Sequence, residues 1–166
     1  DSVRKKVYAS QQPIRNYRDS NAVATMKDLA FRTGMSLSGL HHWKVRTAIG
    51  GGPVLLSGGE VKITNNEELK FSGKAIQDKH PRTAIGYTAD NRVVILVIEG
   101  RNPEASGATL EQEAYLLKKL GCVEGLNLDG GGSSCLLING KETIKPSDKE
   151  GQRAVPAVFM IRQLNP

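Results

Sequence analysis

The residues best suited to chemistry lie in the segment 127–134, which reads Asn-Leu-Asp-Gly-Gly-Gly-Ser-Ser. Asp129 closes a short apolar run, and three glycines and two hydroxyl side chains follow it. Ordering three consecutive glycines is costly unless a ligand approaches the backbone closely or a turn needs positive φ. We therefore interpret the loop as one that cradles a phosphate or a sugar and holds Asp129 against it. A plain tight turn is the alternative, although a turn needs only one or two glycines.

Four other segments place glycines or charged side chains beside apolar runs. They are Gly50-Gly51-Gly52, His80-Pro81-Arg82-Thr83, Glu99-Gly100-Arg101 and Gly107-Ala108-Thr109-Leu110. In this order, together with the triple-glycine loop, they resemble the phosphodiester glycosidase family over about residues 47–161. The resemblance implies hydrolysis of a sugar-1-phosphodiester bond in a phosphorylated glycan or an envelope glycopolymer. It also implies a periplasmic, secreted or lumenal setting.

Such a reaction needs an acid/base carboxylate near the anomeric carbon and cations on the phosphodiester. Asp129 and Glu99 are the candidate catalytic carboxylates, because each follows an apolar run and directly precedes a glycine. The resemblance is complete at Asp129, whereas the family usually has Asp at the position of Glu99. A solvent-facing residue at a strand end is the alternative for Glu99.

Arg82 and Arg101 are the candidate phosphate clamps, since a guanidinium binds two oxygens at once and stays charged. An ion pair with a neighbouring strand is the alternative for Arg82. His80 could donate to the phosphate or relay a proton, or it could be a structural hydrogen-bond partner. Thr109 is a candidate helix N-cap that would direct free N–H groups toward the site. The remaining candidates for binding sugar or phosphate are Asn127, Gly130, Gly131, Gly132, Ser133, Gly51 and Gly52.

The sequence gives no strong metal signal. No cluster of His and Cys has the spacing of a zinc site. Oxygens of Asp129, Asn127 and Glu99 could hold a hard divalent cation, but their spacing alone does not require one. We therefore expect a site without a metal or another cofactor.

Composition excludes several classes of protein. The chain has 166 residues and a net charge of +6, which is spread along the sequence. This charge suits an anionic ligand but lacks the dense basic patch of a nucleic-acid-binding protein. No apolar run is long enough to cross a membrane, and the first residues do not form a signal peptide. Cys122 and Cys135 are interpreted as small buried hydrophobic residues rather than a disulfide.

Hydrophobic patterning predicts an α+β fold: a mixed, largely antiparallel sheet with packed helices and one strand-helix-strand crossover. The expected hairpins join 54–56 to 61–63 and 82–88 to 93–98, and a third turns at Asn139-Gly140. Strand 93–98 has no polar alternation, so it is expected at the centre of the sheet. Helices are expected over 20–34 and from Thr109 to Gly121, and strands over 126–128 and 154–162. Segments 65–79, 145–152 and the pair His41-His42 are expected to be surface loops.

Members of the family carry an earlier strand region, and nothing before Thr47 resembles it. We therefore expect a single domain, 1–166, that forms the C-terminal portion of a phosphodiester glycosidase domain. Its sheet would be completed by an upstream segment, another polypeptide or a second copy, unless this protein departs from the family in this region. Two alternatives to an enzyme stay open: a non-catalytic module that binds carbohydrate or phosphate, and a structural sheet domain completed by a partner chain.

Overall fold

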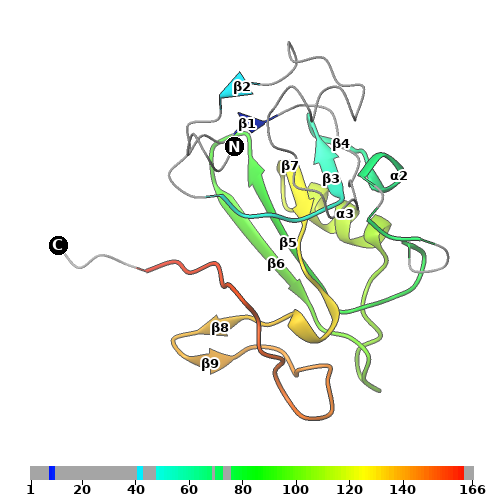
Figure 1. Ribbon diagram of the computed structural model, residues 1–166, viewed down its shortest axis with the longest axis vertical. Helices are drawn as coiled ribbons and strands as arrows, with labels where there is room; N and C mark the ends of the chain where they lie inside the picture. Colours follow the sequence, from blue (N-terminus) through cyan, green and yellow to red (C-terminus); the bar gives the residue numbers. More distant parts are fainter. Residues whose placement is uncertain (1–7, 10–40, 43–47, 69, 73–75, 163–166) are drawn as a thin grey trace, which may run out of the picture.

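The computed structural model describes residues 8–9, 41–42, 48–68, 70–72 and 76–162 (Figure 1). A five-stranded antiparallel sheet with the order β4-β3-β7-β5-β6 forms its centre. The strands are β3 (Val54–Ser57), β4 (Glu60–Val61), β5 (Arg82–Thr88), β6 (Val93–Ile98) and β7 (Cys122–Asn127). Helix α3 (Leu110–Lys119) packs on one face, and the short helix α2 (Asn65–Glu68) follows β4. The predicted α+β class is confirmed.

Two small sheets lie outside the main one. β1 (Tyr8–Ala9) pairs with β2 (His41–His42), and β8 (Leu137–Ile138) pairs with β9 (Lys141–Glu142). The second pair is the hairpin predicted at Asn139-Gly140, where both residues adopt positive φ. His41-His42 lies in a strand and not in the loop expected from the sequence, because its backbone pairs with residues far away along the chain.

Strand β7 joins two hairpins into one sheet. β3 pairs with β4 and β5 pairs with β6, as the turn residues between them predict. β7 lies between β3 and β5 and is antiparallel to both. The connection from β6 through α3 to β7 therefore crosses over β5, which confirms the predicted strand-helix-strand crossover. The strand expected over 126–128 is longer than predicted and begins at Cys122.

The core lies between α3 and the sheet. Thr109 caps α3, and the buried apolar face of this helix packs on fully buried residues of β3 and β5. The cluster consists of Leu55, Leu56, Ala84, Leu110, Ala114, Leu117 and Cys122. Gly121 has positive φ directly after the helix, which ends it as predicted.

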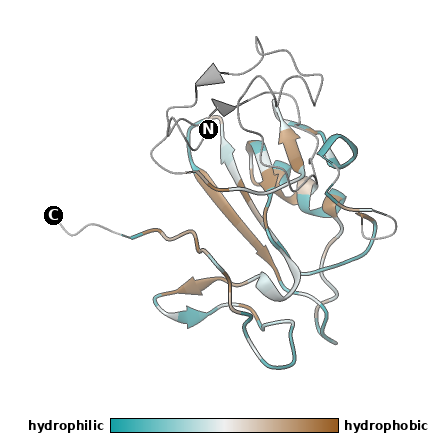
Figure 2. Ribbon diagram, in the orientation of Figure 1, coloured by the Kyte–Doolittle hydropathy of each residue, from teal (hydrophilic) through white to brown (hydrophobic). Residues whose placement is uncertain are grey.

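Three further predictions about elements are wrong. β6 forms an edge of the described sheet instead of its centre, although it is hydrophobic along its length (Figure 2). Its side chains are only half buried after an exposed Val93, and partial cover on both faces produces the same unbroken apolar run as full burial. Residues 154–162 form no strand, because no described strand pairs with them.

The third error concerns segment 65–79, which begins with helix α2 rather than with loop. Asn65 is buried and exchanges two hydrogen bonds with the backbone of Phe71. A polar side chain that satisfies a backbone group makes this polar stretch ordered. The helix expected over 20–34 lies outside the described residues. Both cysteines are free; Cys122 is buried as expected, whereas Cys135 is only partly buried.

Candidate functional site

A pocket of about 610 Å³ lies beside the ends of β5 and β7. Glycine-rich and charged segments that lie far apart in the sequence meet around it. Its lining includes the predicted site residues Gly51, Gly52, His80, Arg82, Arg101, Asn127, Asp129, Gly130, Gly131 and Gly132. Gly50, Lys70, Phe71, Pro81, Leu128 and Arg153 complete it.

Backbone hydrogen bonds hold these segments together. The N–H of Gly52 donates to the carbonyl of Asn127 at 2.7 Å, and the N–H of Asn127 donates to the carbonyl of Pro53 at 3.0 Å. A Cβ at Gly51 would lie 2.4 Å from the carbonyl oxygen of Asn127, so a larger residue would push the two chains apart. The first glycine segment is therefore a wall of the pocket that only glycine permits.

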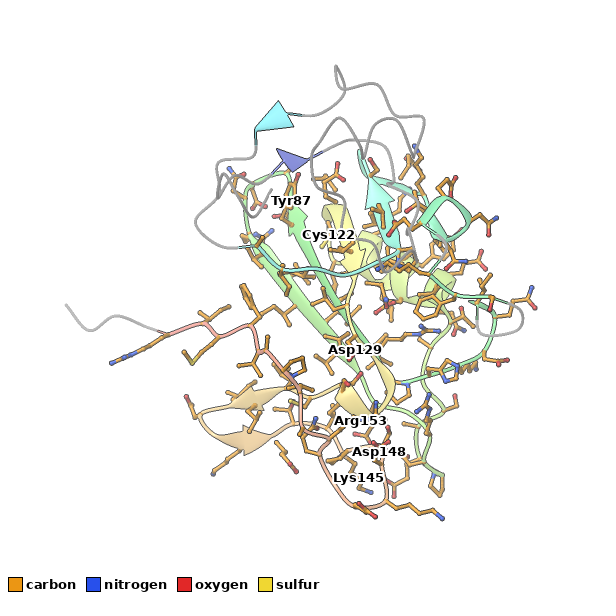
Figure 3. The ribbon with its side chains drawn as sticks, viewed as in Figure 1. Tyr87, Cys122, Asp129, Lys145, Asp148 and Arg153 are labelled. Atoms are coloured by element: carbon orange, nitrogen blue, oxygen red, sulfur yellow. The ribbon has the colours of Figure 1, made fainter. Side chains whose placement is uncertain are left out.

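Asp129 provides the only carboxylate among the described residues of the pocket lining. It lies two residues after Asn127, the last residue of β7, and is exposed. Figure 3 shows it at the end of β7, with Arg153 and Asp148 just beyond. A carboxylate in this place can reach a bound ligand and solvent at once.

Arg82 carries a buried positive charge into the same pocket, and only 3 % of it is exposed. Its Nε donates to the carbonyl of Ala108 at 2.9 Å, and its Nη2 donates to the carbonyl of Asp78 at 3.2 Å. The guanidinium lies over the ring of Phe71, 5.9 Å from the centroid. Burial lowers the pKa of Arg82, and the nearby carboxyl of Glu113 opposes that change. These hydrogen bonds go to carbonyls and not to a carboxylate on a neighbouring strand, so the charge can serve an anion.

His80 and Arg101 form a second polar pair in the pocket. Arg101 Nη2 donates to His80 Nδ1 at 3.1 Å. Burial lowers the pKa of His80, and the charges of Arg101 and Arg82 lower it further, against a smaller opposing effect of Asp78. The imidazole is therefore neutral at pH 7, and because Nδ1 accepts, Nε2 carries the proton. His80 can donate one hydrogen bond to a ligand.

The triple-glycine loop continues into a single 3-10 turn, η3 (Gly131–Ser133). The N–H of Gly131 donates to the carbonyl of Pro81 at 2.9 Å, and those of Ser133 and Ser134 donate within the loop. Among the described residues, no hydrogen-bond partner is found for the N–H groups of Gly130 and Gly132. These two are the backbone donors that could serve a phosphate or a sugar.

Three predicted site residues do not line the pocket. The carboxylate of Glu99 accepts from Asn102 Nδ2 at 2.8 Å and from the N–H of Lys145 at 3.0 Å. The Lys145 N–H, followed by Asn102, holds the pKa of Glu99 below its ordinary value. Glu99 thus ties two loops together.

Thr109 and Ser133 are the other two. Thr109 forms a capping box with Gln112: its side chain accepts from the Gln112 N–H at 3.1 Å, and its own N–H donates to Gln112 Oε1 at 3.0 Å. This confirms its role as the N-cap. Ser133 lies within η3 without reaching the pocket lining.

Sequence reasoning missed Lys70, Phe71 and Arg153. Arg153 pairs with Asp148, with its Nη2 2.9 Å from the carboxylate, and this pair lies against Gly132. Lys70 and Phe71 come from the segment interpreted as a surface loop. The positive charges of Lys70 and Arg153 are the one feature in the sequence that suits an anion-binding pocket. The contacts of all three residues depend on parts of the chain that are distant in sequence.

Within the described ranges, no group of three or more His, Cys, Asp or Glu side chains is arranged to hold a metal ion. Asp129 and Glu99, the two carboxylates considered for a cation, do not share the pocket lining. None of the helices in the described ranges has the length and apolar character needed to span a bilayer.

Comparisons with known proteins agree with the motifs. A family model described as phosphodiester glycosidase matches residues 3–162. Human N-acetylglucosamine-1-phosphodiester alpha-N-acetylglucosaminidase is 39 % identical over 92 residues, which cover 54 % of this chain and 18 % of the human protein. The prophage-derived protein YomE of Bacillus subtilis is 41 % identical over 70 residues, which cover 42 % of this chain and 11 % of that protein. These matches span less than a fifth of either relative.

A solved structure shares the fold. It is the catalytic domain of the zebrafish N-acetylglucosamine-1-phosphodiester alpha-N-acetylglucosaminidase, auto-inhibited by its pro-peptide. The match has a TM-score of 0.54 at 28 % identity and covers 64 % of this chain and 39 % of the zebrafish one.

Proposed function

Because the chain belongs to the phosphodiester glycosidase family, we propose that it hydrolyses the bond between the anomeric carbon of a sugar and a phosphodiester. One observation carries the proposal: a single carboxylate, Asp129, opens into a glycine-walled pocket that also contains Arg82, Arg101 and His80. A carboxylate for the sugar and fixed cations for the phosphate are what this reaction needs.

Each residue then has a role. The guanidinium groups of Arg82 and Arg101 bind the phosphate oxygens and stabilise the negative charge that grows there as the bond to the anomeric carbon breaks. His80 donates through Nε2 to the same phosphate. Asp129 acts at the anomeric carbon as acid/base or nucleophile. Gly51 lets its segment approach the carbonyl of Asn127, and Gly131 leaves room for the guanidinium of Arg101, so both glycines keep these walls of the pocket close together.

A pair of carboxylate variants tests this assignment. Turnover of a synthetic glycosyl methyl phosphodiester is measured for wild type, Asp129→Asn and Glu99→Gln. We expect Asp129→Asn to lose about 100-fold or more in kcat, the usual contribution of an acid/base group. Glu99→Gln should keep most of its turnover, since an amide oxygen can still accept from the Lys145 N–H.

The other outcomes are equally informative. An equal loss in both variants would make Glu99 the second catalytic carboxylate, as the strand-end motifs suggest. Wild-type protein that binds the substrate without turning it over would instead be a carbohydrate- or phosphate-binding module. We also propose that the protein acts outside the cytoplasm, as the family resemblance implies. Fractionation of cells that express the natural gene tests this location.

A further inference from the structure

Helix α3 buries a carboxyl group that the proposed reaction does not use. Glu113 is 0 % exposed and shares the buried face of α3 with Leu110, Ala114 and Leu117. Neither of its carboxyl oxygens has a hydrogen-bond partner in the described part of the chain. A buried ionised carboxylate without partners is very costly, so the group should hold its proton. Burial accordingly raises the pKa of Glu113 to about 8, and the charge of Arg82 opposes this rise.

The start of α3 is fixed to the pocket through Arg82. Ala108, whose carbonyl accepts from Arg82 Nε, directly precedes the N-cap residue Thr109. Glu113 lies one turn into the helix, on the face that packs on the sheet. The charge of Arg82 lowers the pKa of Glu113, and the charge of Glu113 raises the pKa of Arg82.

The other ionisable groups on strands packed against α3 have different surroundings. Glu60 of β4 is exposed and pairs with Lys118. Glu124 of β7 lies on the opposite face of the sheet and accepts from the N–H of Gly58. Cys122 of β7 is a buried thiol whose pKa burial raises. Tyr87 of β5 is exposed, and within the described residues β3 carries no ionisable side chain. On these strands, Arg82 is therefore the charged group that acts on Glu113.

We propose that Glu113 is a positioning residue whose proton sets the affinity of Arg82 for an anion. The inference rests on the proposed role of Arg82 as a phosphate ligand. When Glu113 is protonated, the full charge of Arg82 acts on the bound anion. When Glu113 loses its proton, its carboxylate neutralises Arg82 from the side of the helix, and the anion is held more weakly.

The sign of the pH effect follows from linkage. A bound anion and an ionised Glu113 repel one another, so anion binding must raise the proton affinity of Glu113. Below about pH 8 the carboxyl is protonated with or without the anion, and the affinity for the anion is at its highest. As the pH rises through this value, binding requires proton uptake and the affinity falls.

The test uses sulfate as the probe, because its charge is constant over this range. Sulfate affinity is measured at pH 6.5 and pH 9.5 for wild type and for Glu113→Gln, which is similar in size and cannot ionise. We expect wild type to bind sulfate several-fold more weakly at the higher pH, whereas Glu113→Gln loses much less. The same pH dependence in both proteins would overturn the inference and leave the proposed function standing.

A second measurement needs no variant. The side-chain carboxyl of Glu113 is followed by carbon NMR across the pH range, without and with sulfate. We expect the titration midpoint of the Glu113 carboxyl to move to higher pH when sulfate is added. A midpoint that does not move contradicts the inference. Absence of sulfate binding at every pH would remove Arg82 as an anion ligand and the inference with it. The proposed hydrolysis is judged separately, by the Asp129→Asn turnover measurement.

Discussion

At the scale of single residues, the pocket depends on glycines at which an added side chain would collide with a neighbouring residue. Gly131 has a φ of 62°, and a Cβ placed there would lie 3.1 Å from Nη1 of Arg101. Gly58 has a φ of 60° and open space around the same direction. The two glycines thus share a backbone conformation and differ in what surrounds them.

This pair allows a matched experiment. Gly131→Ala and Gly58→Ala should each lose on the order of 1 kcal/mol of unfolding free energy, the cost of a left-handed non-glycine residue. Only Gly131→Ala should also weaken sulfate binding, because its Cβ requires the guanidinium of Arg101 to move by a few tenths of an ångström. Chemical denaturation and sulfate affinity measure the two effects. Unchanged sulfate binding in Gly131→Ala would mean that the loop is only a turn.

His80 provides a second residue-level prediction. Burial, Arg101 and Arg82 lower its pKa, so we expect its imidazole to titrate below the ordinary value of 6.5 in NMR spectra of the native protein. When the pKa of a histidine is lower in the folded than in the unfolded state, the folded protein becomes less stable as the pH falls from about 6.5 toward the folded-state pKa. Arg101→Gln should move the titration upward, and His80→Gln identifies the resonance. A midpoint above 6.5 would contradict the neutral imidazole.

The sequence predicted most of the pocket lining but not Lys70, Phe71 or Arg153, and it gave no sign of the buried Glu113 outside the pocket. The glycines beside Asp129 indicate a backbone that must turn or approach a neighbour closely, and a sequence shows such residues directly. The charged residues Arg82 and Arg101 are equally visible in it. Phe71 reaches Arg82 only because Asn65 orders its backbone. Such contacts depend on chain segments that meet after folding, and no local pattern records them.

At the scale of elements, α3 shows what periodicity can and cannot predict. Its apolar residues recur at helical spacing at Leu110, Ala114, Leu117 and Leu120. The first three are buried, whereas 51 % of Leu120 is exposed. Leu120 is the C-cap, where the chain leaves helical geometry and the repeat no longer applies. The same spacing gives no sign that Glu113 shares the buried face.

The two leucines make a matched pair for stability. Leu117→Ala should lower the free energy of unfolding by about 2–5 kcal/mol, because a fully buried side chain leaves a cavity against Leu56 and Gly125. Leu120→Ala should change it by no more than about 0.5 kcal/mol. Urea denaturation measures both. Similar losses in the two variants would mean that α3 packs differently on the sheet.

At the scale of the whole molecule, apolar surface remains on described residues at one side. β6 has no strand partner on its outer side in the described sheet, and Val158, Met160 and Ile161 are each more than 70 % exposed. An open apolar strand edge favours pairing with another chain.

We therefore expect the isolated chain to self-associate as its concentration rises. Sedimentation and thermal unfolding across a dilution series measure this, and the double variant Val158→Lys with Met160→Lys should shift the protein toward monomer. A monomer whose melting temperature does not depend on concentration would contradict the expectation, because association makes that temperature concentration-dependent.

The position of β7 between the two hairpins also has a consequence for synthesis on the ribosome. The chain emerges in the order of its sequence, so the hairpins β3–β4 and β5–β6 appear before the strand that separates them. An isolated two-stranded hairpin is at best marginally stable in water. We therefore expect the nascent chain to remain protease-sensitive until residues 122–127 leave the exit tunnel, and then to fold in one step. Since the same strand leads into Asp129 and the glycine loop, most of the pocket lining should appear together with the protease-resistant sheet, and Arg153 should join it later.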